Sequence, residues 1–356
     1  MVAATENGMI LNGLRQSRAR RAHLWLGLLL LGSCLASLAI GASGTSLWQG
    51  VWRALSGAEI SQMERVILWD IRAPRTGLGL LVGAALAVSG TVMQGLFRNP
   101  LADPGIVGVS SGAAFGAVSA IVLGGLLPVG IATVFGQYLV PVAACLGSWA
   151  AVSLLYVVAT RGGQTSVATM LLAGIALGAL AAAGMGLLIY MADDQQLRDI
   201  TFWQLGSLGG ASWAKLGAVA PLLILSVAGA LGLGRALNAL SLGEATALHL
   251  GIPVQRIKRL AVLTVAVATG AAVAMTGVIG FIGIVVPHLL RLATGPDHGP
   301  LLINAALLGA ALLLWADVIA RVVIGPAELP IGIVTALIGA PVFLWILLRS
   351  RGVMGL

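Results

Sequence analysis

Charged residues are scarce in this chain of 356 residues, in which Asp, Glu, Lys and Arg together make up only 9% of the positions. A soluble globular domain carries about 25% charged residues. Hydrophobic residues account for 59% of the chain, and the mean hydropathy is +1.02. So few charges cannot cover a surface exposed to water, and the sequence therefore predicts an all-α, polytopic membrane protein.

Several chemical signatures are absent as well. No G-x-x-x-x-G-K-[ST] loop occurs, so the chain cannot bind ATP in that way. The two cysteines lie in apolar runs and the four histidines lie at span ends or in loops, so neither set suggests a metal or haem ligand. No acidic residue lies in the middle of an apolar run, although proton-coupled carriers usually need one near the membrane midplane. These absences argue against an enzyme and against an ion-coupled carrier.

The stretch 71–113 organises the rest of the chain. The 22 positions from Thr76 to Phe97 hold no charge and reach roughly 33 Å as a helix, enough to cross a bilayer core of about 30 Å. Arg72 and Arg75, with Pro74 between them, mark the start of this helix, and the Asn- and Pro-rich residues 99–105 must turn the chain.

Ten membrane spans follow from the same reading. The basic N-terminus and first apolar run could also be a signal peptide, but the nine later spans favour a retained first helix. Residues 43–75, which carry Trp48, Trp52 and Trp69, are expected to form an amphipathic outer segment, and 193–210 a short surface helix. The predicted spans are 24–42, 77–97, two within 104–160 divided at 127–130, 168–191, 213–234, two within 260–294, 300–319 and 331–348.

Basic residues predict the orientation. Ten spans place both termini on one side, and that side holds 13 of the 20 Lys and Arg residues. The positive-inside rule therefore predicts that both termini are cytoplasmic. We expect a cytoplasmic tail at 1–23, a ten-helix domain at 24–348 with a cytoplasmic segment at 236–259, and a second tail at 349–356.

An internal repeat is visible. Residues 83–92, GAALAVSGTV, match 270–279, GAAVAMTGVI, at five of ten positions. The copies lie in spans 2 and 7, which cross the membrane in opposite directions, as in the inverted repeats of many transporters. Two helices rich in Gly and Ala could also look alike by composition alone.

Two polar features are candidates for function. In the segment 240–254, Ser241 followed by Glu244 predicts a capping box, and Gly251 and Pro253 a stop, so a helix of about two turns is expected at 242–250. Such a helix suits docking to a cytoplasmic partner, although a plain connecting loop is the alternative. On the other side, Arg72, Arg75 and Arg321 lie at span ends, where they could capture acidic groups of an external protein or anchor the chain to lipid headgroups.

From Arg72 onward the chain resembles the permease subunits of the ATP-binding-cassette (ABC) importers for iron–siderophores, haem and cobalamin, and it is most similar to the haem-uptake branch. The motifs that carry the resemblance are RAPR at 72–75, GAALAVSGTVMQGLFRNPLADPGIVGVSSGA at 83–113, LLAGIALG at 171–178, LGEATALHLGIPV at 242–254, GFIGIVVPHLLR at 280–291, and ADVIAR with ELPIGIVTALIGAPVFLW at 316–345.

The resemblance implies a homodimer in the bacterial inner membrane, two cytoplasmic ATPase subunits that bind ATP and Mg²⁺, and a periplasmic binding protein. It implies no cofactor, metal or nucleic acid bound by this chain. The binding protein would dock on Arg72, Arg75 and Arg321. The ATPase would seat on Ser241, Leu242, Gly243, Glu244, Ala247, His249, Leu250 and Gly251. The cytoplasmic gate would comprise Asn99, Leu101, Val167 and Ala168. A ferric siderophore or cobalamin is the alternative substrate, and an ion-coupled secondary transporter is the alternative of another class.

Overall fold

The computed structural model describes residues 2–41, 61–325 and 327–350. Much of the predicted outer segment 43–75, including Trp48 and Trp52, lies outside the described residues, whereas Trp69 lies within them. The long helices are α1 (Val2–Ala39), α4 (Ala73–Phe97), α5 (Val109–Leu123), α7 (Leu139–Ala159), α8 (Val167–Met191), α10 (Trp213–Leu231), α13 (Val254–Thr276), α14 (Ile282–Thr294), α15 (His298–Val322) and α16 (Ile331–Ser350). The short elements are α3 (Gln62–Arg65), α6 (Val129–Phe135), β1 (Thr160–Arg161), β2 (Gln164–Thr165), α9 (Asp194–Leu205), α11 (Gly234–Ser241) and α12 (Glu244–His249).

An apolar helix of the described chain corresponds to each of the ten predicted spans. By length and composition, eight helices in the described chain can cross a membrane, and α14 and α16 are shorter apolar helices. The chain divides near 127–130 as predicted, with α6 inserted between α5 and α7. The predicted surface helix at 193–210 is α9, which begins with a capping box between Asp193 and Gln196.

The second span is longer than predicted. The sequence suggested that it begins beside Pro74, whereas one continuous helix runs from Gln62 to Phe97. A proline inside a helix removes a backbone donor, and here a π-helical stretch at Val66–Arg72 directly precedes it. In that stretch the Ala73 N–H bonds Leu68 O, five residues back, so the helix absorbs the proline instead of ending there.

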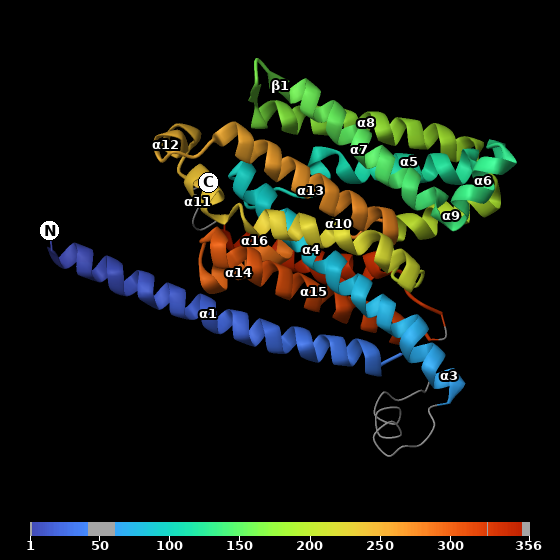
Figure 1. The fold of residues 1–356 in the computed structure, drawn as a ribbon, viewed down its shortest axis with the longest axis horizontal. Helices are drawn as coiled ribbons and strands as arrows, with labels where there is room; N and C mark the ends of the chain where they lie inside the picture. The colour runs from blue at the N-terminus through green and yellow to red at the C-terminus, as the bar shows by residue number, and fades with distance from the viewer. Residues whose placement is uncertain (1, 42–60, 326, 351–356) are drawn as a thin grey trace.

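The helix α4 forms the centre of the bundle (Figure 1). Within the most apolar stretch of 62–97, 78% of residues are buried, against 6% in α8. Glycines allow this enclosure, because a side chain at Gly83 would collide with the backbone of α15 at Gly309. A side chain at Gly90 would collide with α14 at Gly283.

The repeated segments lie in α4 and α13, which run in opposite directions along the bundle (Figure 1). Gly90 of the first copy continues α4, whereas its counterpart Gly277 has φ +72 and ends α13. The two copies therefore both form helices, which run in opposite directions, but their backbones differ from the eighth residue onward.

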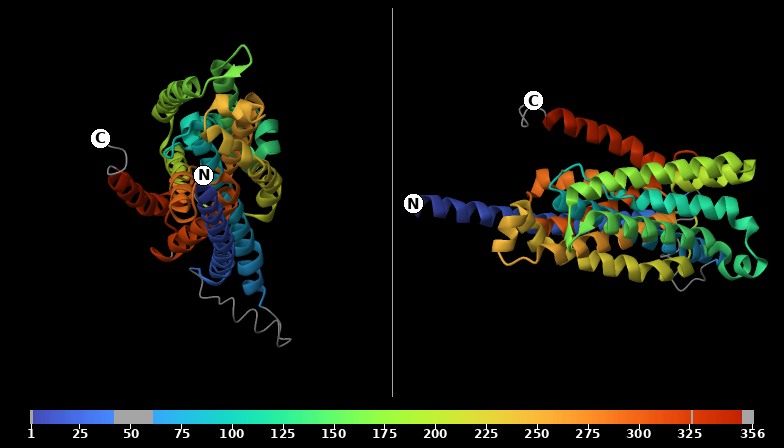
Figure 2. Two further views of the ribbon diagram at one scale, coloured as in Figure 1. Left: turned by 90° about the vertical axis from the view of Figure 1, so that its left-hand side faces the viewer. Right: turned by 90° about the horizontal axis from the view of Figure 1, so that it is seen from above.

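The bundle has two distinct ends. The helices α11 and α12 and the β1–β2 hairpin lie at the end where α1 begins and α16 ends, which we call the α12 end (Figures 1 and 2). The helices α3, α6 and α9 lie at the opposite end, the α9 end (Figure 1).

Candidate functional site

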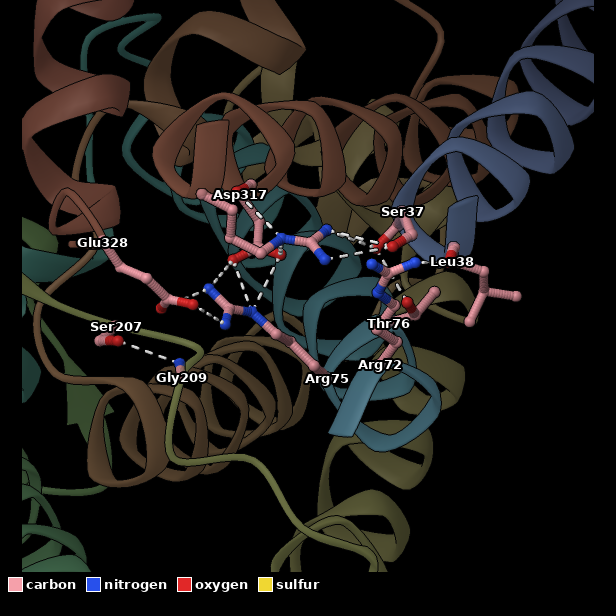
Figure 3. Close-up of polar contacts among 10 residues, drawn as sticks. Ser37, Leu38, Arg72, Arg75, Thr76, Ser207, Gly209, Asp317 and Glu328 are labelled. Carbon is pink, nitrogen blue, oxygen red and sulfur yellow. Dashed lines mark hydrogen bonds and ion pairs between the residues drawn. The ribbon is translucent and has the colours of Figure 1, made fainter. Parts of the chain in front are cut away.

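The three arginines predicted to lie outside the membrane gather at the α9 end, where α1 ends and α3 leads into α4 (Figure 1). Figure 3 shows Arg72 and Arg75 there, close to Ser37 and Asp317. Arg72 ends the π-helical stretch, Arg75 lies in the first turn of α4, and Arg321 lies in the last turn of α15. All three side chains are buried. Their guanidinium groups point into a polar cluster formed by α1, α4, α15 and the loop before α16, rather than outward to lipid or solvent.

Asp317 forms the centre of this cluster. Its carboxylate accepts hydrogen bonds from Arg75 Nε at 3.0 Å and from Arg75 Nη2 at 2.8 Å. Arg321 Nε lies 3.1 Å from the second oxygen, one helical turn along α15. The Asp317 side chain is only 1% exposed. A carboxylate so buried is stable only when it is paired and hydrogen-bonded, and two guanidiniums meet that requirement.

Glu328 is the second carboxylate that pairs with Arg75. Its oxygens accept Arg75 Nη1 at 2.7 Å and Nη2 at 3.0 Å, which is the bidentate geometry that guanidinium and carboxylate favour. The Glu328 side chain is 42% exposed, whereas the side chains of Arg75 and Asp317 are buried. Arg75 therefore bonds a buried carboxylate on one side and a solvent-accessible carboxylate on the other.

The C-terminal end of α1 supplies the remaining acceptors. Arg72 Nη1 donates to Leu38 O at 2.8 Å and to Ala39 O at 3.1 Å. Arg321 donates to Ser37 O at 3.2 Å and to Ser37 Oγ at 3.1 Å. Carbonyls at a helix C-terminus lack intrahelical donors and attract cations, so the two arginines fix α1 against α4 and α15.

The predicted capping box at the α12 end is wrong. Ser241 belongs to α11, where its Oγ bonds Asn238 O at 2.6 Å, and the N-cap of α12 is Gly243 with φ +112. A second short helix, α11, extends to Ser241, so this residue lies at a helix C-terminus rather than before a first turn. The expected helix is otherwise present as α12, and the predicted stop is confirmed by Gly251 at φ +78.

Glu244 has a different role from the predicted one. Its carboxylate accepts a hydrogen bond from Lys258 Nζ at 2.8 Å, and the same ammonium group donates a second hydrogen bond to Thr165 O at 2.8 Å. The Thr165 N–H donates to Gln255 Oε1 at 2.9 Å. Because Lys258 is buried, these bonds hold α12, the start of α13 and the β1–β2 hairpin as one unit.

The other predicted coupling residues divide by exposure. Ala247 is fully buried, and His249 and Gly251 are exposed. The leucines at 242, 248 and 250 are 60% exposed or more. An apolar cluster of this kind at the tip of a polar segment is typical of a protein contact surface.

A hydrogen-bonded joint links α11 to α15. Asn238 Nδ2 donates to Asp297 Oδ1 at 2.7 Å, and Asn238 Oδ1 accepts the His298 backbone N–H at 2.9 Å. Asp297 is the N-cap of α15. The helix that carries Asp317 and Arg321 near one end is therefore bonded to α11 at the other.

Three of the four predicted gate residues line one pocket of about 320 Å³ at the α12 end: Asn99, Val167 and Ala168. Leu101 is not among the lining residues, and its N–H donates to Asn99 Oδ1 at 2.9 Å. Asp103 also lines this pocket, and its Oδ1 accepts the Gly105 N–H at 2.7 Å. Desolvation raises the pKa of the Asp103 carboxyl, and the Gly105 hydrogen bond opposes that rise.

Sequence reasoning missed the carboxylates of the α9 end as functional residues. Asp317 lies four residues before Arg321, a spacing that pairs opposite charges on one helix face and could have drawn attention to it. Nothing local connects Glu328 with Arg75, 253 residues earlier. Within residues 2–41, 61–325 and 327–350, no group of three or more His, Cys, Asp or Glu side chains is placed to hold a metal ion.

Comparison with known proteins shows which family the chain resembles in sequence. The FecCD transport family matches residues 28–349. The chain is 45% identical to the hemin transport system permease protein HmuU of Yersinia pestis over 85% of this chain and 88% of that protein. It is 42% identical to the vitamin B12 import system permease protein BtuC of Klebsiella pneumoniae over 98% and 99% of the two chains.

A solved structure agrees with this assignment. The fold matches a metal-chelate type ABC transporter in an inward-facing conformation with a TM-score of 0.81 and 34% identity, over 93% of this chain and 99% of that one. The sequence match and the fold match each cover nearly the whole chain. The protein belongs to the FecCD transport family, the permeases of ABC transporters.

Proposed function

We propose that two copies of this chain form the membrane pathway of an ATP-driven importer that moves haem, or a related iron complex, into the cytoplasm. The observation that carries the proposal is the pairing of two polar sites at opposite ends of one bundle, the arginine–carboxylate cluster and the α11–α12 unit. An importer of this family type must contact a donor protein on one side and an energy source on the other.

The ATPase subunits would seat on α11 and α12. Supporting this, α12 is held by Glu244, Lys258 and Thr165, so a push on it is transmitted to α13 and the hairpin. Its exposed leucines provide an apolar contact surface. Closure of the ATPase dimer would move this unit as a rigid body and open or close the pocket lined by Asn99 and Val167.

The binding protein would dock on the arginine cluster by exchange. Arg75 and Arg321 are buried and already bond Asp317, so an incoming carboxylate meets no vacant guanidinium on those two residues. Glu328 is the exposed partner of Arg75. An acidic side chain of the binding protein would displace Glu328 and take over the Nη1 and Nη2 contacts, while Asp317 keeps Arg75 in place.

A second copy would pack beside α8 and α16. In the end-on view of Figure 2 these two helices lie on the same side of the bundle. Both present large exposed apolar side chains, among them Leu172 and Leu180 on α8 and Leu337 and Leu344 on α16. Two such faces related by a two-fold axis would enclose a pathway that grips its substrate weakly.

Haem as the substrate is supported by the 45% identity to a hemin permease. A ferric siderophore or cobalamin is the alternative, because the identity to a vitamin B12 permease is nearly as high. The excess of basic residues at the end with both termini supports an inner-membrane protein with cytoplasmic termini.

Transport by reconstituted protein tests the proposal. The chain is placed in liposomes with its ATPase subunits inside and its binding protein outside, and uptake of haem and of cobalamin is measured with ATP and with a non-hydrolysable analogue. ATP-dependent haem uptake is expected. Uptake driven by a proton or sodium gradient, without ATPase subunits, would instead establish an ion-coupled carrier.

A further inference from the structure

A second, separate groove runs between α7 and α13 on the outside of the bundle. It has a volume of about 450 Å³ and is lined by Trp149, Val152, Ser153, Tyr156, Val157, Arg259, Val262, Leu263 and Ala266. None of these residues belongs to α8 or α16, and none lines the pocket at the predicted gate. The groove is therefore distinct from the proposed pathway and from both docking sites.

The groove has an apolar length and a polar mouth. Arg259 lies in the second turn of α13 and Tyr156 in the last turn of α7, so both lie toward the α12 end. Trp149 and Ala266 lie about two turns deeper, roughly 10 Å along the helices. Trp149, Val157 and Leu263 are each more than half exposed, so they face whatever surrounds the bundle.

The polar groups at the mouth have no partner in the described part of the chain. No hydrogen bond or ion pair of Arg259 or Tyr156 is found there, whereas the neighbouring Lys258 bonds both Glu244 and Thr165. Arg259 is an exposed cation at the edge of this groove, and an exposed cation at a membrane surface attracts anionic lipid headgroups. A mainly apolar groove with one cation at its mouth matches the chemistry of an anionic phospholipid, which has apolar acyl chains and a negative headgroup.

We propose that this groove is a binding site for one anionic phospholipid. Arg259 holds the phosphate, Tyr156 donates its hydroxyl to a phosphate or ester oxygen, and one acyl chain lies along Val152, Ser153 and Ala266. The surrounding bilayer supplies this ligand continuously. Because α13 follows α12 directly, a lipid held here fixes the outer face of the unit through which the ATPase is proposed to act, although the site itself requires only that the bundle lies in a membrane.

Native mass spectrometry of the purified full chain tests the site. The probes are dioleoylphosphatidylglycerol and dioleoylphosphatidylcholine, which share their acyl chains and differ in headgroup charge. The phosphatidylglycerol adduct is expected to survive at least about fivefold better than the phosphatidylcholine adduct, the factor expected of one basic contact at a membrane surface. Arg259→Gln should abolish that preference, and Arg259→Lys should retain most of it.

Two further variants distinguish lipid binding in the groove from a general attraction of lipid to basic surface residues. Arg256→Gln removes the same charge one turn earlier on α13, outside the groove lining, and should leave the preference unchanged. Ser153→Trp should fill the exposed groove and reduce both adducts; should that variant fail to elute as folded protein, Val157→Trp is used in the same way. Equal retention of the two lipids by the unaltered chain, or equal losses in Arg256→Gln and Arg259→Gln, would overturn the proposal. So would disulfide formation between two copies carrying Val157→Cys, because a second copy would then cover the groove.

Discussion

Arg75 on α4 and Asp317 on α15 meet through three hydrogen bonds of 2.8–3.2 Å, although 242 residues separate them in the chain. The pair is buried at the end of the bundle where an external protein is proposed to dock. The same α15 begins at Asp297, where Asn238 bonds it to α11. One helix, α15, therefore joins the proposed docking cluster to the proposed ATPase contact.

The first prediction concerns the stability of this cluster. Asp317→Asn leaves two buried guanidiniums without their shared anion and should reduce the free energy of unfolding by about 3–5 kcal/mol. Thermal aggregation of the protein in detergent measures the change. Glu328→Gln is the matched control, since its side chain is 42% exposed and an ion pair of that exposure contributes about 0–1 kcal/mol. Similar losses in the two variants would contradict the central role of Asp317.

The second prediction concerns docking by exchange. Glu328→Gln removes the carboxylate that competes for Arg75 Nη1 and Nη2, so the binding protein should bind more tightly, by about threefold to tenfold at low salt. Surface plasmon resonance on the nanodisc-embedded complex measures the affinity. Charge reversal of Arg75 is a poor test, because a carboxylate placed beside Asp317 would unfold the cluster. Weaker binding in Glu328→Gln would show that Glu328 itself contacts the binding protein.

The third prediction concerns the apolar tip of α12. Leu248→Asp places a charge in the proposed contact with the ATPase and should prevent the ATPase subunits from copurifying, a loss of at least about tenfold in the recovered complex. Leu248→Met keeps an apolar side chain of similar size and should leave the complex intact. The elution profile of the permease alone should be the same for both variants, because Leu248 is 60% exposed. An intact complex with Leu248→Asp would place the ATPase contact elsewhere.

Charge and hydropathy predicted the spans because lipid imposes a strong and local constraint on sequence. An uncharged run such as Thr76–Phe97 is stable in a bilayer as a helix, because a helix satisfies all of its backbone hydrogen bonds internally. Local signals were weaker guides to helix ends. Ser241 and Glu244 have the spacing of a capping box, but the preceding residues of α11 already form a helix, and Gly243 alone can adopt the φ of +112 that separates the two helices.

The contacts within the sites depend on packing that no local pattern encodes. Arg72, Arg75 and Arg321 were identified from their positions at span ends, yet their burial and partners arise from the approach of α1, α4 and α15. Glu328 lies in a loop and reaches Arg75 only because α15 returns the chain to the start of α4. The sequence could indicate which side chains bear charge at each end, but not that Arg75 and Arg321 share the buried carboxylate of Asp317.

The last prediction concerns pH. Burial raises the pKa of Asp103, and a Cβ at Gly283 would lie only 3.2 Å from its Oδ2, so α14 covers the carboxylate closely. Since the folded state binds this proton more tightly than the unfolded chain does, Asp103 favours folding most at a pH below its ordinary pKa. That contribution declines as the pH rises through the interval between the ordinary value and the raised value, and above it the ionised carboxylate is a fixed cost.

Asp103→Asn removes this titration but keeps a side-chain oxygen that accepts the Gly105 N–H. The variant should therefore gain thermal stability over the unaltered protein at pH 7 and lose that advantage at about pH 3, below the ordinary Asp pKa, where Asp103 is mostly protonated in both states. Asp194→Asn, at an exposed position on α9, makes the same change in net charge and controls for it. A stability difference between Asp103→Asn and the unaltered protein that is the same at both pH values would show that the carboxyl is hydrated in the gate pocket, and that α14 does not seal it from water.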